Sequence, residues 1–167
     1  MHRICYDEVE IGQSIEPLVK GPLTTAHLMR WSAAVENWHK IHYDAAFAVE
    51  HDRLPGLLIS GSLKQQFIAN LLKDWVGQSG WVWKMKFQFR AMNVVGETLS
   101  TWAKVTGKRK LDAFGLIDLE IGILNERGLE SAPGVAVVAL PFANGPAVPY
   151  PFPDLHRMTP DGSVFSA

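Results

Sequence analysis

The sequence predicts an α+β protein in which helices come first and an antiparallel sheet follows. Two observations in its 167 residues support this prediction. The front half has apolar residues at helical spacing, whereas the rear half alternates apolar and polar residues between short polar turns. Strands joined by hairpins pair antiparallel, so one long helix packed against one curved antiparallel sheet is the simplest arrangement.

Two helices are expected in the front half. The first covers residues 26–36, with Thr25 as its N-cap, because apolar side chains recur there at helical spacing. The second is longer, begins near Gly61 and ends at Gly77. Its apolar stripe consists of Leu63, Phe67, Leu71, Leu72 and Trp75. A stripe this wide predicts that the long helix is covered by the rest of the domain.

Four strands are expected in the rear half, at residues 81–91, 98–108, 113–125 and 134–140. In the first of them the alternation is strict, which predicts one shared face for Trp81, Trp83, Met85, Phe87 and Phe89. The polar residues between them would face the other way. A strand of this kind is half-buried and belongs to an antiparallel sheet.

The chain is expected to divide into one domain, residues 1–140, and a proline-rich extension, residues 141–167. The extension is aperiodic, yet it is more apolar than disordered segments usually are. Its large apolar side chains are Phe142, Tyr150, Phe152, Leu155 and Phe165. They favour an arm packed on its own domain or on a neighbour over a disordered tail.

Composition excludes several classes of protein. With 16 Lys and Arg against 17 Asp and Glu, the chain has no excess of positive charge for duplex nucleic acid. The single cysteine, Cys5, excludes a disulfide framework and a cysteine-based zinc site. The first residues are too acidic for a signal peptide and no apolar run approaches the length of a membrane span. We therefore expect a cytosolic protein with no nucleic-acid or membrane partner and no bound metal.

The segment whose side chains are best suited to catalysis is residues 35–44, Val-Glu-Asn-Trp-His-Lys-Ile-His-Tyr-Asp. It places His39 and His42 three residues apart, with Asn37 and Asp44 on either side. Histidine titrates near neutral pH and therefore suits proton transfer. Histidines on a polar surface, with Asp44 as a helix cap, would explain the same residues. Spacing alone leaves both interpretations open.

Several short blocks, taken in order, resemble the MaoC-like hydratase/dehydratase family. They are residues 6–12, 21–24, the histidine segment, 54–61 (Leu-Pro-Gly-Leu-Leu-Ile-Ser-Gly), 87–91 and 96–99. The resemblance covers residues 6–140 and implies the hot-dog fold, a long central helix wrapped by an antiparallel sheet. It also implies hydration of trans-2-enoyl thioesters of coenzyme A or acyl carrier protein to (R)-3-hydroxyacyl thioesters, or the reverse. The thioester carrier belongs to the substrate, and no cofactor is implied. Sheets of this family usually join edge to edge, so the resemblance implies a homodimer or a dimer of dimers.

The histidine segment departs from the common family motif, Gly-Asp-x-Asn-Pro-Ile-His. The motif aspartate is Asn37 here, its asparagine is His39, and its histidine is kept as His42. The segment is similar to that of the mitochondrial 3-hydroxyacyl-thioester dehydratases and mesaconyl-type CoA hydratases, which implies activity with a rearranged acid/base set. The alternative is a degenerate subunit that binds acyl thioesters or pairs with an active partner. A thioesterase is a weaker alternative, because the long helix offers only Asp74, near its far end.

We expect His42 to act as the general base, with His39 or Asn37 orienting the attacking water. The resemblance and the start of the long helix both assign Gly61 to the thioester oxygen, because a helix N-terminus exposes unpaired N–H groups. Ser60 stands where the family has a histidine. The expected contacts to the substrate come from Ser60, Trp38 and Ile41.

Overall fold

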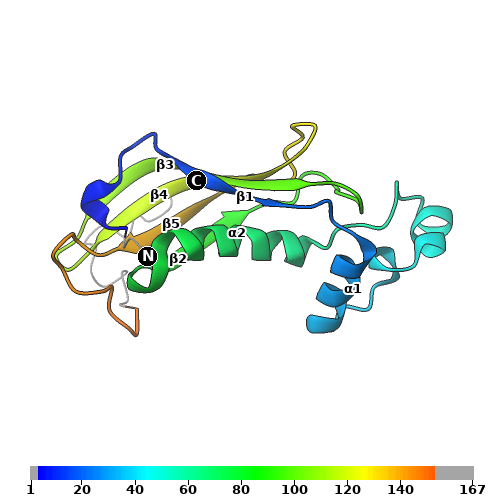
Figure 1. Cartoon of the computed structure of the whole chain (residues 1–167), viewed down its shortest axis with the longest axis horizontal. Helices are drawn as coiled ribbons and strands as arrows, with labels where there is room; N and C mark the ends of the chain where they lie inside the picture. The colour runs from blue at the N-terminus through cyan, green and yellow to red at the C-terminus, as the bar shows by residue number, and fades with distance from the viewer. Residues whose placement is uncertain (1–3, 153–167) are drawn as a thin grey trace.

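The computed structural model describes residues 4–152 and confirms the α+β class. Its helices are α1 (Thr25–Ala34) and α2 (Gly61–Val76), and its strands are β1 (Ser14–Lys20), β2 (Trp81–Phe87), β3 (Leu99–Lys110), β4 (Gly115–Asn125) and β5 (Gly134–Leu140). Short helical turns occur at Tyr6–Glu8, Lys40–His42, Phe47–His51 and Gly77–Ser79. The strands form one antiparallel sheet in the order β1-β3-β4-β5-β2, and α2 lies along one of its faces (Figure 1).

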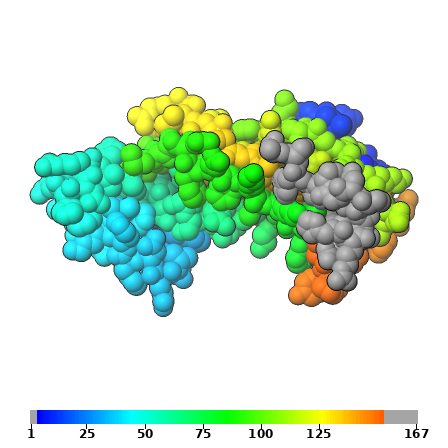
Figure 2. All heavy atoms as spheres, turned by 180° about the vertical axis from the view of Figure 1, so that it is seen from behind, coloured from blue at the N-terminus to red at the C-terminus, as the bar shows by residue number. Residues whose placement is uncertain are grey.

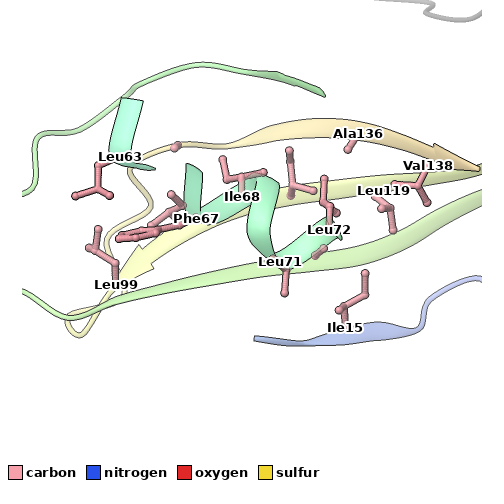
Figure 3. Close-up of a cluster of buried hydrophobic side chains, with 14 of the residues drawn as sticks. Ile15, Leu63, Phe67, Ile68, Leu71, Leu72, Leu99, Leu119, Ala136 and Val138 are labelled. Carbon is pink, nitrogen blue, oxygen red and sulfur yellow. The ribbon is translucent and has the colours of Figure 1, made fainter. Parts of the chain in front are cut away.

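The core lies between α2 and the sheet (Figure 3). From α2 come Leu63, Phe67, Ile68, Leu71 and Leu72, and from the strands Ile15, Leu99, Leu119, Ala136 and Val138. All ten are buried, and burial of each large aliphatic side chain stabilises the fold by about 1.5–3 kcal/mol. The expected stripe and both expected ends of the long helix are confirmed, since Gly77 follows its last residue. The cap of α1 is Thr24 rather than Thr25, because the Thr24 N–H donates to His27 Nδ1.

Strand β1 is absent from the sequence prediction. Its residues, Ser-Ile-Glu-Pro-Leu-Val-Lys, do not alternate, and Pro17 cannot donate to a ladder. The strand lies at the edge of the sheet and pairs only with β3, with a shift of register between Ile15 and Leu18. Proline is tolerated in such a place, since an edge strand with a bulge needs fewer donors.

The prediction that the apolar residues of β2 all share one face is wrong, because Trp83 lies on the opposite face from Met85 and Phe87. A shift of register between Val82 and Lys84 inserts one residue and reverses the alternation. Val82, Met85 and Phe87 therefore pack against the core, whereas Trp83 packs against a second cluster built around Phe114, Leu116, Val137 and Ala139. Phe89 lies beyond the end of the strand and is 52% exposed.

The extension packs on its own domain between residues 141 and 152. The Phe152 ring lies 5.9 Å from the rings of both Trp81 and Trp83 and 5.8 Å from that of Phe114. This contact covers part of the second apolar cluster. Two of the apolar residues from which this packed arm was expected, Leu155 and Phe165, lie outside the described residues. No helix within residues 4–152 is long and apolar enough to cross a membrane.

The segment that contains the histidines lies at one end of the molecule. In Figure 1, α1 and the residues that follow it project past the end of the sheet, on the side where α2 begins. The space-filling view shows the same residues as a lobe at one end (Figure 2). This arrangement places the histidine segment beside the N-terminus of α2, although about twenty residues separate them in the sequence.

Candidate active site

The end of α1 directs the chain into the histidine segment. Asn37 N–H donates to Ser32 O at 2.9 Å and Glu36 N–H donates to Ala33 O at 3.4 Å, which is the Schellman arrangement. Glu36 is left-handed, with φ 53°. The motif that this segment resembles has glycine at this position, and glycine adopts such a conformation without a steric penalty.

We expect Glu36→Gly to raise the free energy of unfolding by about 0.5–1 kcal/mol, because it relieves the left-handed conformation of an L-residue. The gain is smaller than the full penalty, since glycine also makes the unfolded chain more flexible. Urea unfolding would measure it. The control is Glu50→Gly in the turn Phe47–His51, where helical φ and ψ give glycine no advantage and stability should fall. A loss of stability in Glu36→Gly would contradict the prediction.

His42 is buried and its ring is oriented by the main chain. Its Nδ1 lies 2.9 Å from the carbonyl oxygen of Leu58, and Leu58 N–H donates to Ile41 O at 3.0 Å. A carbonyl only accepts, so Nδ1 carries the proton and Nε2 carries the lone pair. Within residues 4–152 no hydrogen bond uses Nε2. With Nδ1–H held by the carbonyl, Nε2 is the ring nitrogen that is placed to accept a proton.

Asn37 and His39 bind the backbone of their own segment. Asn37 Oδ1 accepts the His39 N–H at 3.3 Å, and His39 Nδ1 accepts the Ile41 N–H at 3.4 Å. Nδ1 of His39 is therefore an acceptor, which leaves its Nε2 with the proton. The His39 and His42 rings lie 6.2 Å apart, centroid to centroid. One ring thus offers a donor and its neighbour an acceptor.

The remaining residues of the segment have simpler places. Asp44 Oδ1 accepts the N–H of Phe47 at 3.0 Å, so the capping interpretation of Asp44 is confirmed. The Trp38 side chain is 56% exposed, and the Trp38 carbonyl accepts the Tyr43 hydroxyl at 2.9 Å. Ile41 is half-buried and contacts the 57–59 segment through its main chain.

The start of α2 leaves amide groups unpaired. Ser60 occupies the N-cap position, but its hydroxyl pairs with the Ser62 hydroxyl at 2.8 Å, and Trp31 Nε1 donates to the same Ser62 oxygen at 2.8 Å. No hydrogen bond among the described residues uses the Gly61 N–H, as is usual for the first turn of a helix. A Cβ at Gly61 would lie 2.8 Å from the Phe89 ring, so this glycine also allows the ring to pack on the helix start.

The 57–61 segment joins the histidine to the helix start. Leu58 holds His42 and lies three residues before Gly61, so their Cα atoms are at most about 11 Å apart. Ile59 N–H donates to Asn93 O at 2.8 Å and fixes the segment on its other side. The structure therefore brings His42, His39 and the Gly61 amide to one end of α2, whereas Asn37 Oδ1 accepts the His39 N–H of its own segment.

Lys64, which the sequence analysis does not single out, lies buried in the same place. It is 3% exposed, and its Nζ donates to Ala91 O and to Asn93 Oδ1, both at 3.0 Å. Burial lowers its pKa to about 8, an effect that the Glu97 carboxylate partly offsets. A signal for it exists in the sequence, because Lys64 precedes Phe67 and Ile68 by three and four residues and so falls on the apolar side of the helix.

Glu97 is the acceptor at the centre of this buried network. Its carboxylate accepts from Asn93 Nδ2 at 2.8 Å and from Asn125 Nδ2 at 3.1 Å, and Arg127 pairs with it at 3.2 Å. Glu97 itself is buried, whereas the Arg127 side chain is 70% exposed. The network therefore connects the first turn of α2 to the end of β4.

The lowered pKa of Lys64 predicts a pH dependence of stability. The unfolded chain holds this proton up to about the ordinary value of 10.5, whereas the folded chain releases it near 8. Between these values the unfolded state binds more protons, so the free energy of unfolding rises with pH. The full effect is on the order of 3 kcal/mol. Other groups titrate in the same range. The quantity to measure is therefore the difference in the free energy of unfolding between the wild type and Lys64→Met, obtained by urea unfolding between pH 7 and 10. A difference that does not change with pH would contradict the prediction.

No group of three or more His, Cys, Asp or Glu side chains within residues 4–152 is arranged to hold a metal ion. The site instead offers imidazole groups, serine hydroxyls and a free helix amide. These groups can bind and move protons and can stabilise a negative oxygen.

The fold is that of known hydratases. An (R)-hydratase from A. caviae superimposes with a TM-score of 0.71 and 24% identity, over 80% of this chain and 98% of that one. The R-hydratase PhaJ1 from Pseudomonas aeruginosa gives a TM-score of 0.74 and 20% identity, over 84% and 87%. A chain of the ChsH1-ChsH2 complex from Mycobacterium tuberculosis gives a TM-score of 0.68 and 14% identity, over 78% of this chain and 98% of that one. At these identities the likeness establishes the hot-dog fold alone.

No curated protein matches the sequence. A family model does match it: that of hydroxyacyl-thioester dehydratase type 2 covers residues 12–97, just over half of the chain. The matched stretch runs from the turn before β1 through the histidine segment and α2 to Glu97, so it contains every candidate site residue. The chain belongs to the hydroxyacyl-thioester dehydratase type 2 family.

Proposed function

We propose that the chain reversibly adds water to a trans-2-enoyl thioester of coenzyme A or acyl carrier protein and forms an (R)-3-hydroxyacyl thioester. The observation that carries this proposal is the orientation of His42, whose Nδ1 is held by the Leu58 carbonyl and whose Nε2 is left as an acceptor. Membership of the family supports the reaction class. The names of two similar structures, both (R)-hydratases, support the stereochemistry.

In this mechanism His42 Nε2 takes a proton from water as the water oxygen bonds to the β carbon. The electrons of the C=C bond move toward the thioester oxygen and form an enolate. The α carbon then takes the proton back from the His42 imidazolium, and the thioester carbonyl reforms. One residue serves as base and then as acid, so hydrogen and hydroxyl add to the same face of the double bond.

The water would lie between the two imidazoles. His42 Nε2 accepts from it and His39 Nε2–H donates to it, and the ring separation of 6.2 Å is compatible with one bridging water. Asn37 then supports the segment through its bond to the His39 amide, in place of the aspartate of the common motif. The proposed mechanism therefore needs no carboxylate beside the water.

The enolate oxygen would bind at the start of α2. The Gly61 N–H is unpaired among the described residues and lies at the positive end of the helix dipole. We assign further substrate contacts to Ser60, Trp38 and Ile41. The carrier, coenzyme A or acyl carrier protein, enters as part of the substrate, and the mechanism uses no other cofactor.

We also propose that two copies of the chain associate, as a homodimer or a dimer of dimers. The sheet has two edges, β1 and β2, and an unprotected edge strand favours pairing with another chain. Pro17 and the adjacent bulge make β1 a poor template, which leaves β2 as the better one.

One assay tests the proposed reaction. The purified chain is incubated with crotonyl-CoA and with a branched unsaturated dicarboxylyl-CoA, while the enoyl thioester absorbance and the release of free thiol are followed. Loss of the enoyl absorbance without thiol release, with an (R)-3-hydroxyacyl product on chiral analysis, is the expected result. Thiol release alone would indicate a thioesterase. Binding of CoA esters without any turnover would indicate a noncatalytic subunit.

A further inference from the structure

Lys64 carries a charge whose position is unfavourable for folding. The side chain is 3% exposed, so its ammonium has lost most of its hydration. It also occupies the fourth position of α2, where the positive end of the helix dipole repels a cation. Replacement of buried charged groups by apolar residues is often neutral or stabilising. A buried ammonium in the first turn of a helix is unfavourable for folding, and its place next to a candidate active site points to a function for the charge.

The ammonium lies close to the proposed oxyanion position. One aromatic ring contacts both, because the Phe89 ring centroid is 5.2 Å from Lys64 Nζ, and ring atoms lie 2.8 Å from where a Cβ of Gly61 would be. An aromatic ring screens charge far less than water does. The positive field of the ammonium therefore extends to the first turn of α2.

The same ammonium is connected to the proposed base. Lys64 Nζ binds Asn93 Oδ1, and the Asn93 carbonyl accepts the N–H of Ile59. Ile59 directly follows Leu58, whose carbonyl holds His42. The chain of contacts from Lys64 to His42 thus runs through one side chain and one stretch of backbone.

We propose that Lys64 is a positioning residue of the hydration site: its ammonium adds positive charge behind the Gly61 amide, where the enolate oxygen becomes negative, and it fixes the 91–93 segment against the 57–61 segment. This inference rests on the proposed function and deepens it. Lys64 does not touch the reacting atoms. It strengthens the stabilisation of a negative oxygen at a site built by other groups.

The charged groups around Lys64 are few. From the segment before β3, Glu97 faces it through Asn93, and from the turn after β4, Arg127 binds Glu97 on the other side. Within residues 4–152, the 89–91 segment contributes the Phe89 ring and the Ala91 carbonyl, and the residues one turn away along its own helix, Ser60, Gly61, Phe67 and Ile68, carry no charge. Because the pKa of Lys64 is about 8, the proposed assistance should fade as the pH rises above that value.

The test compares an enolate-like ligand with a neutral one. Acetoacetyl-CoA binds an oxyanion site as its enolate, which is followed by its ultraviolet absorbance, whereas butyryl-CoA has no acidic α proton of this kind. Lys64→Met should weaken enolate binding at least tenfold and change butyryl-CoA affinity less than threefold. Lys64→Arg, which keeps the charge, should restore enolate binding to within about threefold. The control is Lys73→Met, which replaces an exposed lysine in the last turn of the same helix and should alter neither affinity.

Turnover provides the second measurement. With crotonyl-CoA, Lys64→Met should lower kcat at least tenfold with little change in KM, and the decline of wild-type kcat above pH 8 should be absent from this variant. Equal losses for both ligands would indicate a loosened site and overturn the proposal, as would unchanged enolate binding. If the wild type hydrates no enoyl thioester but the two ligands still differ, the proposed function fails and the role of Lys64 in oxyanion binding stands.

Discussion

Replacing His42 with Asn is expected to lower the kcat for enoyl thioester hydration by at least about a hundredfold, because general base catalysis typically contributes that much or more. The asparagine amide can still donate to the Leu58 carbonyl, which His42 Nδ1 binds at 2.9 Å. It has no group in the position of Nε2. The variant therefore removes the base and keeps the hydrogen bond that orients it. The kcat should fall strongly, while the free energy of unfolding should change little.

The matched control is His51→Asn. His51 is also a histidine on this lobe, but its side chain is 72% exposed and stacks on Phe47, 4.6 Å between ring centroids. This variant should hydrate crotonyl-CoA at the wild-type rate. Urea unfolding of both variants shows that the fold is intact. A near-normal kcat in His42→Asn would refute the assignment of the base.

Gly61→Ala is expected to reduce kcat by about tenfold to a hundredfold, somewhat less than complete loss of one oxyanion-hole donor. The added methyl group would lie 2.8 Å from the Phe89 ring, which is closer than two carbon atoms can approach. Either the ring or the start of α2 must move, and the Gly61 amide moves with the helix. Stability should fall slightly, since the gain of alanine over glycine at the first helical position is smaller than the about 1 kcal/mol of a helix interior and offsets only part of the poorer packing.

Two further variants identify the cause of that loss. Gly56→Ala is the matched control, because its Cβ would come no closer than 3.6 Å to Val94 and its kcat should stay near the wild-type value. Phe89→Leu combined with Gly61→Ala removes the collision, so this double variant should recover activity relative to Gly61→Ala alone. Wild-type kcat in Gly61→Ala would contradict the prediction.

Features that depend on local patterns could be predicted. The bounds of α2 follow from an apolar stripe that begins after Gly61 and ends at Gly77, and both ends are confirmed. Strands β3, β4 and β5 are found within two residues of their expected limits, because hairpin neighbours leave alternation and turn residues in the sequence. The capping role of Asp44 was also predictable, since a cap binds an amide only a few residues away.

Features that depend on distant partners could not. Strand β1 becomes a strand only because β3 lies beside it, and Pro17 hides it from any local pattern. The bulge in β2 sends Trp83 to the opposite face from the one its alternation predicts, because register is set by pairing with β5. For the same reason Phe152 and Trp83, about seventy residues apart, pack together.

The sequence by itself determined the class of fold, the position of the long helix and the histidine segment, because these depend on spacing within a few residues. Only the tertiary structure decided which nitrogen of His42 stays free, that Asn37 Oδ1 is engaged by its own segment, and that the cation Lys64 is buried against Ala91 and Asn93. The physical reason is that ring orientation and burial are set by atoms that meet across the fold: a carbonyl sixteen residues away for His42, and the 89–93 segment for Lys64.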